Sequence, residues 1–179
     1  EFVEKNQGRE DVAGHIQAAR EEAGLKAGDD VVAALLGWMN EDKKVTSLKA
    51  LQGLIWEDGY HSGNLKGHIY EDAVEGLKKW HAEGLNLYVY SSGSIYAQKL
   101  LFGHSEAGDL TPLFSDYFDT TSGHKREQAS YETIAQAIGV SADSILFLSD
   151  VAEELDAASA AGYRTVQLVR DTNTIESES

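Results

Sequence analysis

The chain has 179 residues and no cysteine, and its 30 acidic and 15 basic residues give a formal charge of −15. The length fits one domain, or one domain with a small insert. The acidic balance argues against a nucleic acid or an anionic membrane as the partner, and the lack of cysteine excludes disulfides and thiolate metal sites. The longest uncharged apolar run, residues 31–39, is about half of the ~20 residues that a membrane span needs, so we expect a soluble protein. The absence of cysteine agrees with a reducing compartment, so the cytoplasm is the expected location.

The first third of the chain is predicted to be helical throughout. From residue 1 to about residue 60, Ala, Leu, Glu and Lys dominate, and apolar residues recur at helical spacing, as they do within 31–39. Polar residues interrupt this pattern after residue 39, and a second helix is predicted over 43–56. We therefore expect a helical module of its own over residues 1–66.

The remaining sequence alternates between helical and strand patterns. Glycines at 84, 139 and 162 follow three of the helices, where a left-handed C-cap needs glycine. Such alternation is typical of a parallel sheet with right-handed crossovers, so we predict an α/β core over 67–170 and a frayed acidic tail over 171–179. The predicted elements are the helix 71–83, strand 85–90, helix 94–102, strand 116–119, helix 126–138, strand 145–149, helix 153–161 and strand 164–169.

Polar side chains follow three of the predicted strands. Ser91 and Ser92 come after the first, Lys125 lies a few residues beyond the second, and Asp150 ends the third. Because ligands bind off the carboxyl ends of parallel strands, we expect these side chains to converge. A pair of hydroxyls, an ammonium and a carboxylate together suggest phosphate chemistry.

Each of these residues also has a simpler interpretation. Ser91 and Ser92 precede a helix, whose free N–H groups and dipole favour an anion, but Ser92 or Ser94 can equally be the N-cap of that helix. Lys125 can offset charge on a transferring phosphoryl group or hold nearby carboxylates ionised. Taken alone, it is an exposed lysine at the start of a helix.

Carboxylates cluster after the third strand. Asp150, followed closely by Glu154, offers the hard oxygen ligands that suit Mg²⁺. The alternative is that Asp150 caps the next helix, and acidic residues such as Glu154 are common in a first helical turn for dipole reasons. Asp156 is a weaker candidate still.

Two further polar residues lie one helical turn apart in the predicted helical module. Lys49 and Gln52 share a helix face and can contact a substrate from there, although such a pair is more often a solvated face. The six histidines show no paired ligand spacing, so a zinc site has little support.

Five segments carry a resemblance to a known family. The chain resembles the haloacid-dehalogenase-like phosphohydrolase superfamily and, within it, the enolase-phosphatase family of methionine salvage. The resemblance covers nearly the whole chain, and the second and third segments are far more specific than any superfamily motif. The segments are Leu-Lys-Ala-Leu-Gln-Gly at 48–53, Tyr-Val-Tyr-Ser-Ser-Gly-Ser at 88–94, Ala-Gln-Lys-Leu-Leu-Phe-Gly-His-Ser at 97–105, Tyr-Phe-Asp-Thr at 117–120 with Gly-His-Lys at 123–125, and Ile-Leu-Phe-Leu-Ser-Asp at 145–150.

The resemblance implies a Rossmann-like core with a helical cap inserted before Tyr70, a Mg²⁺ cofactor and a monomer. It implies a small phosphorylated diketone as substrate: 2,3-diketo-5-methylthiopentyl-1-phosphate is converted to its enol and then dephosphorylated to the acireductone. Mapped onto this sequence, Ser91 and Ser92 match the phosphate site, Lys125 matches the motif cation and Asp150 matches the distal Mg²⁺ ligand. Glu154 lies where the superfamily often keeps a further carboxylate.

The sequence departs from the family at the nucleophile. These phosphatases use an aspartate that ends an N-terminal strand and is followed two residues later by an acidic residue, and no such strand precedes the predicted cap. The strand should lie at the centre of the sheet, between the strands that end at Ser91 and Asp150, so its loss leaves two ladders open. We therefore expect a fragment of an enolase-phosphatase whose first strand lies upstream of Glu1, and we expect these residues alone to bind phosphate poorly and turn over nothing.

Two other functions fit the same residues. One is a catalytically dead relative that binds a phosphorylated ligand or a protein through the retained cap. The other keeps the enzyme class and changes the substrate to another small phosphoester.

Overall fold

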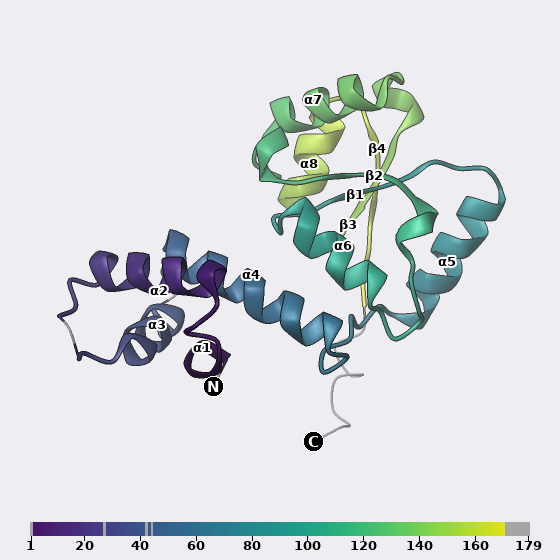
Figure 1. Cartoon of the computed structure of the whole chain (residues 1–179). Helices are drawn as coiled ribbons and strands as arrows, with labels where there is room; N and C mark the ends of the chain where they lie inside the picture. Colours follow the sequence, from purple (N-terminus) through teal and green to yellow (C-terminus); the bar gives the residue numbers. More distant parts are fainter. Residues whose placement is uncertain (1, 27, 42, 44, 171–179) are drawn as a thin grey trace. The chain divides into compact units, whose positions relative to one another are not determined.

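The computed structural model describes residues 2–26, 28–41, 43 and 45–170, so the predicted tail over 171–179 lies outside the described residues. The chain forms two compact units, one of residues 1–74 with 99–111 and the other of residues 75–98 with 112–179 (Figure 1). Within the described part of the chain, no helix is both long and apolar enough to span a bilayer.

The first unit is mainly helical, as predicted. Asp30 starts α3 because its carboxylate accepts hydrogen bonds from the amides of Val32 and Ala33, at 2.9 and 3.2 Å. The helices enclose an apolar cluster of Val3, Val12, Ala19, Val31, Leu35, Leu48 and Leu51. The four helices are α1 (Phe2–Lys5), α2 (Glu10–Glu22), α3 (Val31–Asn40) and α4 (Thr46–His61).

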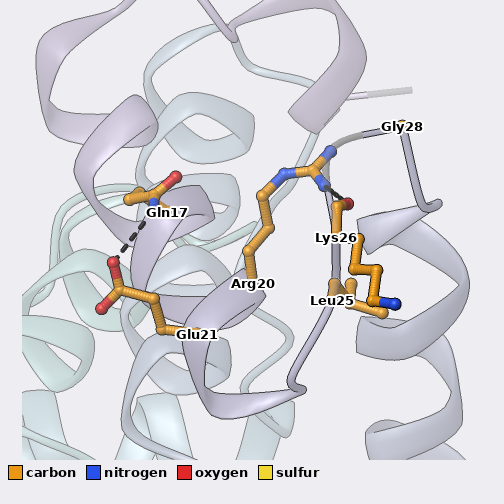
Figure 2. Close-up of a pocket in the computed structure, with 6 residues that line it drawn as sticks. All are labelled: Gln17, Arg20, Glu21, Leu25, Lys26 and Gly28. Atoms are coloured by element: carbon orange, nitrogen blue, oxygen red, sulfur yellow. Dashed lines mark hydrogen bonds between the residues drawn. The ribbon is translucent and has the colours of Figure 1, made fainter.

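A hollow opens beside the C-terminal half of α2 in this unit, and Figure 2 shows its lining. Its polar side chains bond locally: the Arg20 guanidinium donates to the Lys26 carbonyl at 3.4 Å, and Gln17 donates to Glu21 at 2.9 Å. Because these groups already satisfy one another, the hollow makes no strong candidate for a functional site. It is lined by Gln17, Arg20, Glu21, Leu25, Lys26 and Gly28.

The second unit carries the alternating pattern of strands and helices. The glycines at 84, 139 and 162 have φ angles of 83°, 79° and 92°, which confirms the predicted left-handed positions after three helices. The elements are α5 (Glu71–Ala82), β1 (Leu87–Tyr90), α6 (Ile95–Gly103), β2 (Phe114–Phe118), α7 (Gln128–Ile138), β3 (Leu146–Ser149), α8 (Ala152–Ala160) and β4 (Arg164–Gln167), of which α5 and α6 each belong partly to the first unit.

The strands pair in parallel, as predicted, and they form two separate sheets, which agrees with the predicted sheet that lacks its central strand. β1 pairs with β2, with Val89 opposite Tyr117, and β3 pairs with β4, with Leu148 opposite Val166. Within residues 2–26, 28–41, 43 and 45–170, β1 and β3 each have a strand partner on one edge only. The second edge of each strand is therefore open in the described residues.

Tyr131 of α7 forms the centre of the second unit's core. It is fully buried, and the rings of Tyr90, Phe147 and Tyr163 lie 5.6, 5.1 and 5.7 Å from its own. These aromatic residues come from β1, β3 and the segment before β4, so the cluster joins both sheets to α7. Buried Ala135, Ala157 and Ala158 belong to the same cluster.

Candidate functional site

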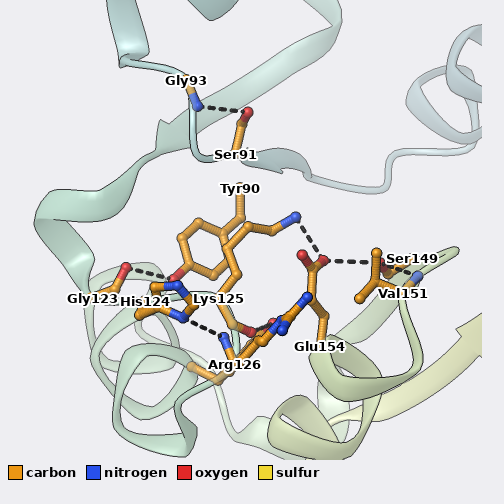
Figure 3. Close-up of polar contacts among 11 residues, drawn as sticks. Tyr90, Ser91, Gly93, Gly123, His124, Lys125, Arg126, Ser149, Val151 and Glu154 are labelled. Carbon is orange, nitrogen blue, oxygen red and sulfur yellow. Dashed lines mark hydrogen bonds and ion pairs between the residues drawn. The ribbon is translucent and has the colours of Figure 1, made fainter. Parts of the chain in front are cut away.

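Lys125 brings the ends of three strands together in the second unit (Figure 3). Its Nζ lies 2.6 Å from Oε2 of Glu154 and 5.9 Å from the centre of the Tyr90 ring. The same carboxylate oxygen accepts a hydrogen bond from Oγ of Ser149 at 2.9 Å. Tyr90 ends β1, Lys125 follows β2 and Ser149 ends β3, so one ion pair connects the carboxyl ends of all three strands.

Partial burial strengthens this ion pair. The side chains of Lys125 and Glu154 are only 20% and 11% exposed, so the attraction between them is screened less than at a free surface. Lys125 was expected either to offset charge on a phosphoryl group or to hold nearby carboxylates ionised. The structure shows its ammonium beside a carboxylate. Glu154 is the predicted extra metal ligand, and its Oε2 already has two partners; its role at a metal stays a prediction.

Asp150 lies directly after β3 and is exposed. It does not cap α8: the N-cap is Val151, whose amide donates to Oγ of Ser149 at 3.1 Å. In the described part of the chain, no three His, Asp or Glu side chains are grouped so as to hold a metal ion. Since Mg²⁺ takes few protein ligands and prefers oxygen, Asp150 fits as one ligand and does not form a complete site.

Ser91 and Ser92 form the turn between β1 and α6. The Ser91 amide donates to the carbonyl of Phe118 at 3.1 Å, and its hydroxyl accepts from the Gly93 amide at 3.1 Å. Ser94 caps α6, because its hydroxyl accepts from the amide of Ala97 at 3.2 Å. The capping alternative therefore applies to Ser94, and the Ser92 side chain is exposed.

Asp119, which follows β2 directly, is a site residue that the sequence analysis missed. Its buried carboxylate accepts from the amide of Ile95 at 3.1 Å, and from the amide and hydroxyl of Thr121 at 2.9 and 2.6 Å. The hydrogen bonds from Thr121 hold the pKa of Asp119 below its usual value. The Asp-Thr-Thr sequence at 119–121 was the available signal, since an aspartate two residues before a threonine is typical of a side-chain-capped turn.

Gln98 of α6 was also missed. Its side-chain amide donates to the carbonyls of Gly93 and Phe118, both at 2.9 Å, and thereby fastens α6 to the ends of β1 and β2. Together, Asp119 and Ser94 occupy two of the first amides of α6. An anion beside this helix must therefore rely more on hydroxyls and on Lys125 than on free amides.

Lys49 and Gln52 both lie on α4 of the first unit, Lys49 exposed and Gln52 half-buried. The helical spacing that puts them on one face is confirmed. Their contact with a substrate stays a prediction.

Comparisons with known proteins support the same chemistry. A family model described as haloacid dehalogenase-like hydrolase matches residues 3–162. Enolase-phosphatase E1 of Pseudomonas savastanoi pv. phaseolicola is 62% identical over 172 residues, which cover 95% of this chain and 76% of that protein. Enolase-phosphatase E1 of Azotobacter vinelandii is 58% identical, with the same shares. The crystal structure of the UTR4 protein of Saccharomyces cerevisiae is 35% identical and has a TM-score of 0.78, covering 91% of this chain and 74% of that chain.

The parallel strands, the polar residues at their carboxyl ends and the family match define a hydrolase of the haloacid dehalogenase-like class, with an α/β fold. The relatives narrow this class further, because they share about 60% identity over nearly all of the chain. The chain belongs to the enolase-phosphatase E1 family.

Proposed function

We propose that this site serves a Mg²⁺-dependent enolase-phosphatase that converts 2,3-diketo-5-methylthiopentyl-1-phosphate to its enol and then to the acireductone of methionine salvage. The observation that carries the proposal is the Lys125–Glu154 ion pair at 2.6 Å, which gathers the ends of β1, β2 and β3 at one place. The names of relatives at 58–62% identity support it.

Each polar residue has a distinct part in the proposal. The hydroxyls of Ser91 and Ser92 donate to the phosphate oxygens of the substrate, and the ammonium of Lys125 offsets their negative charge. Asp150 holds Mg²⁺, which polarises a carbonyl and neutralises phosphate when bound. Glu154 keeps the Lys125 ammonium in place through its ion pair.

A further strand supplies the nucleophile in this proposal. No Asp-x-Asp or Asp-x-Glu occurs in residues 1–179, yet β1 and β3 each have one edge without a strand partner in the described residues. A strand that ends in Asp-x-Glu and pairs with both edges completes the sheet. Its first carboxylate attacks phosphorus, the ester bond to the substrate oxygen breaks, and water then hydrolyses the aspartyl-phosphate.

In this proposal, residues 1–66 form the helical cap domain and residues 67–170 form the core domain. Lys49 and Gln52 contact the non-phosphate part of the substrate from α4. In the extended protein, we expect Lys49→Ala and Gln52→Ala to raise the KM for the diketone more than the KM for a generic phosphoester. Equal effects on both would favour another small phosphoester as the substrate. We also propose that the protein is a monomer.

The test compares two proteins: residues 1–179, and the same chain extended at its N-terminus by an apolar strand ending in Asp-x-Glu. Phosphate release and the absorbance of the enol are followed with and without Mg²⁺. We expect both products from the extended protein with Mg²⁺ and none from residues 1–179. An extended protein with Asn in place of the added nucleophile is the matched control and should release no phosphate.

Two outcomes contradict this proposal. Phosphate release by residues 1–179 alone shows that the nucleophile lies elsewhere. An extended protein that folds cooperatively and turns over no substrate favours the binding-module interpretation instead.

A further inference from the structure

Three successive backbone carbonyls, those of residues 123–125, each accept a hydrogen bond from a side-chain hydroxyl. The donors are two tyrosines and a serine, and they come from two elements, β1 and α7. The bonds run from Tyr90 Oη to the Gly123 carbonyl at 3.0 Å, from Ser130 Oγ to the His124 carbonyl at 2.8 Å and from Tyr131 Oη to the Lys125 carbonyl at 2.6 Å. A polar turn is more commonly solvated by water, so this arrangement calls for an explanation.

Two of the three donor residues are buried in the core of the unit. Tyr131 is 0% exposed and Ser130 is 2% exposed, and the Tyr131 ring packs against Tyr90 and Phe147. Burial raises the pKa of Tyr131 and of Tyr90 above the ordinary tyrosine value, so both hydroxyls keep their protons and remain donors at neutral pH. The carbonyls are therefore fixed to the core itself.

Gly123 allows the segment to approach these donors. Its φ of 122° lies in the left-handed half of the map, and a Cβ at this position would overlap Ser130 Oγ. The segment takes this path only with glycine there, which indicates a single defined conformation for residues 123–125.

The backbone carbonyl and the side-chain ammonium of Lys125 are therefore both fixed. Its carbonyl bonds to Tyr131, while its ammonium pairs with Glu154 and lies over the Tyr90 ring. Figure 3 shows the ammonium pointing to Glu154 from above the segment. Tyr90 thus contributes twice, once through its hydroxyl and once through its ring.

We propose that Tyr90, Ser130 and Tyr131 are positioning residues that fix the 123–125 segment and so hold the Lys125 ammonium where the substrate phosphate is bound. The effect of these residues on catalysis rests on the proposed function, whereas their effect on the position of Lys125 does not. None of the three touches the substrate in this proposal; each acts through the backbone of the segment.

The first experiment measures the hold on Lys125 in residues 1–179, without any activity. The coupling between Lys125 and Glu154 is obtained from urea unfolding of Lys125→Met, Glu154→Gln and the double variant, and is then measured again in a Tyr131→Phe background. We expect the Lys125–Glu154 coupling to change the unfolding equilibrium constant by a factor of about ten. In the Tyr131→Phe background, this factor should be severalfold smaller. Any general loss of stability cancels, because the coupling is a difference between differences.

Tyr163→Phe is the matched control. Tyr163 is also buried and packs on Tyr131, and its hydroxyl donates to a backbone carbonyl at 2.8 Å, but that carbonyl belongs to Tyr131 in α7. The coupling should survive Tyr163→Phe. If Tyr131→Phe prevents folding, Ser130→Ala replaces it, with the same expected drop. An unchanged coupling in the hydroxyl-deleted background overturns the proposal.

The second experiment measures activity in the extended protein. Tyr131→Phe should lower kcat about tenfold with little change in KM, and the loss should disappear in a Lys125→Met background, because the effect passes through Lys125. A tenfold loss that persists without Lys125 overturns the proposal. If the extended protein is inactive from the start, the proposed function fails, and the coupling measurement still decides whether the hydroxyls hold Lys125.

Discussion

The two polar segments that follow β1 and β2 are held very differently. In residues 123–125, every carbonyl bonds to a hydroxyl and the lysine ammonium is paired. In residues 91–93, Ser91 is anchored through its amide and its hydroxyl closes a short turn, while Ser92 is exposed. The comparison indicates that the fold fixes the position of the Lys125 ammonium, whereas the exposed Ser92 side chain is less constrained by its surroundings.

Removal of the Lys125 ammonium should affect turnover more than any other change in the two segments. In the extended protein, Lys125→Met should lower kcat for phosphate release by about 10²–10³-fold, the usual loss when one preorganised charge at a reacting phosphate is removed. It also leaves the partly buried Glu154 without its partner, which should cost about 2 kcal/mol of stability. Lys78→Met, on the exposed face of α5, is the control and should change neither quantity. A full kcat in Lys125→Met would contradict the assigned role.

A pair of glycine variants compares the two segments directly. Gly123→Ala should destabilise the protein by about 2 kcal/mol, because φ is positive there and the new methyl group meets Ser130. Gly93→Ala should stay within about 0.5 kcal/mol, since the nearest atom to an added Cβ is Ser91 Oγ at 3.5 Å. Urea denaturation of both variants measures the difference. Equal losses would show that the two segments are equally constrained.

The serines of the freer segment should affect binding rather than stability. Ser92→Ala should raise KM for the phosphorylated substrate about tenfold, as expected for one hydrogen bond to a charged oxygen, and change the unfolding free energy by less than about 0.5 kcal/mol. Ser94→Ala should do the opposite, costing about 1 kcal/mol through the lost N-cap and leaving KM unchanged. Steady-state kinetics and urea unfolding of the two variants separate these effects; a KM that rises in Ser94→Ala instead would reverse the assignment.

The smallest effect concerns Asp119, whose carboxylate accepts hydrogen bonds from the amides of Ile95 and Thr121, each two residues away from one of the segments. Its folded-state pKa is lowered by the bonds from Thr121, so its carboxylate stabilises the fold above the unfolded value of about 3.9, and this stabilisation is lost as the pH falls through the folded pKa. In Asp119→Asn, the free energy of unfolding should therefore decrease less steeply as the pH falls below about 4. Urea midpoints from pH 5 to pH 2.5 measure how stability depends on pH. An unchanged pH dependence in Asp119→Asn would show that other groups cause the loss of stability in acid.

Local patterns were enough to predict the elements and most of the polar residues. The helix ends at glycine, the alternation of strands and helices, and the position of Lys125 after β2 all followed from short stretches of sequence. The start of β2 was predicted two residues late, at 116 rather than at Phe114, because the exposed Ser115 and Asp116 hide the strand pattern. The two separate sheets agree with the missing central strand that the family resemblance predicts.

The contacts that define the site could not be predicted in this way. Glu154 lies 29 residues after Lys125, and its place in a first helical turn gives no indication that it pairs with this lysine. No short sequence pattern indicates that the Tyr131 hydroxyl bonds to the Lys125 carbonyl. Asp119 caps a helix that precedes it in the sequence. Such pairings depend on tertiary packing, which a single sequence does not encode in any local period.

The open edges of β1 and β3 also bear on how residues 1–179 behave in solution. Strand edges that lack a partner among the described residues present amides and carbonyls to any other extended chain, including a second copy. At neutral pH the charge of −15 keeps copies apart. Near the isoelectric point of about 4.6 this repulsion vanishes, so colloidal stability should be lowest there, and a buffer well above that pH with little added salt is the natural choice for keeping the chain dispersed.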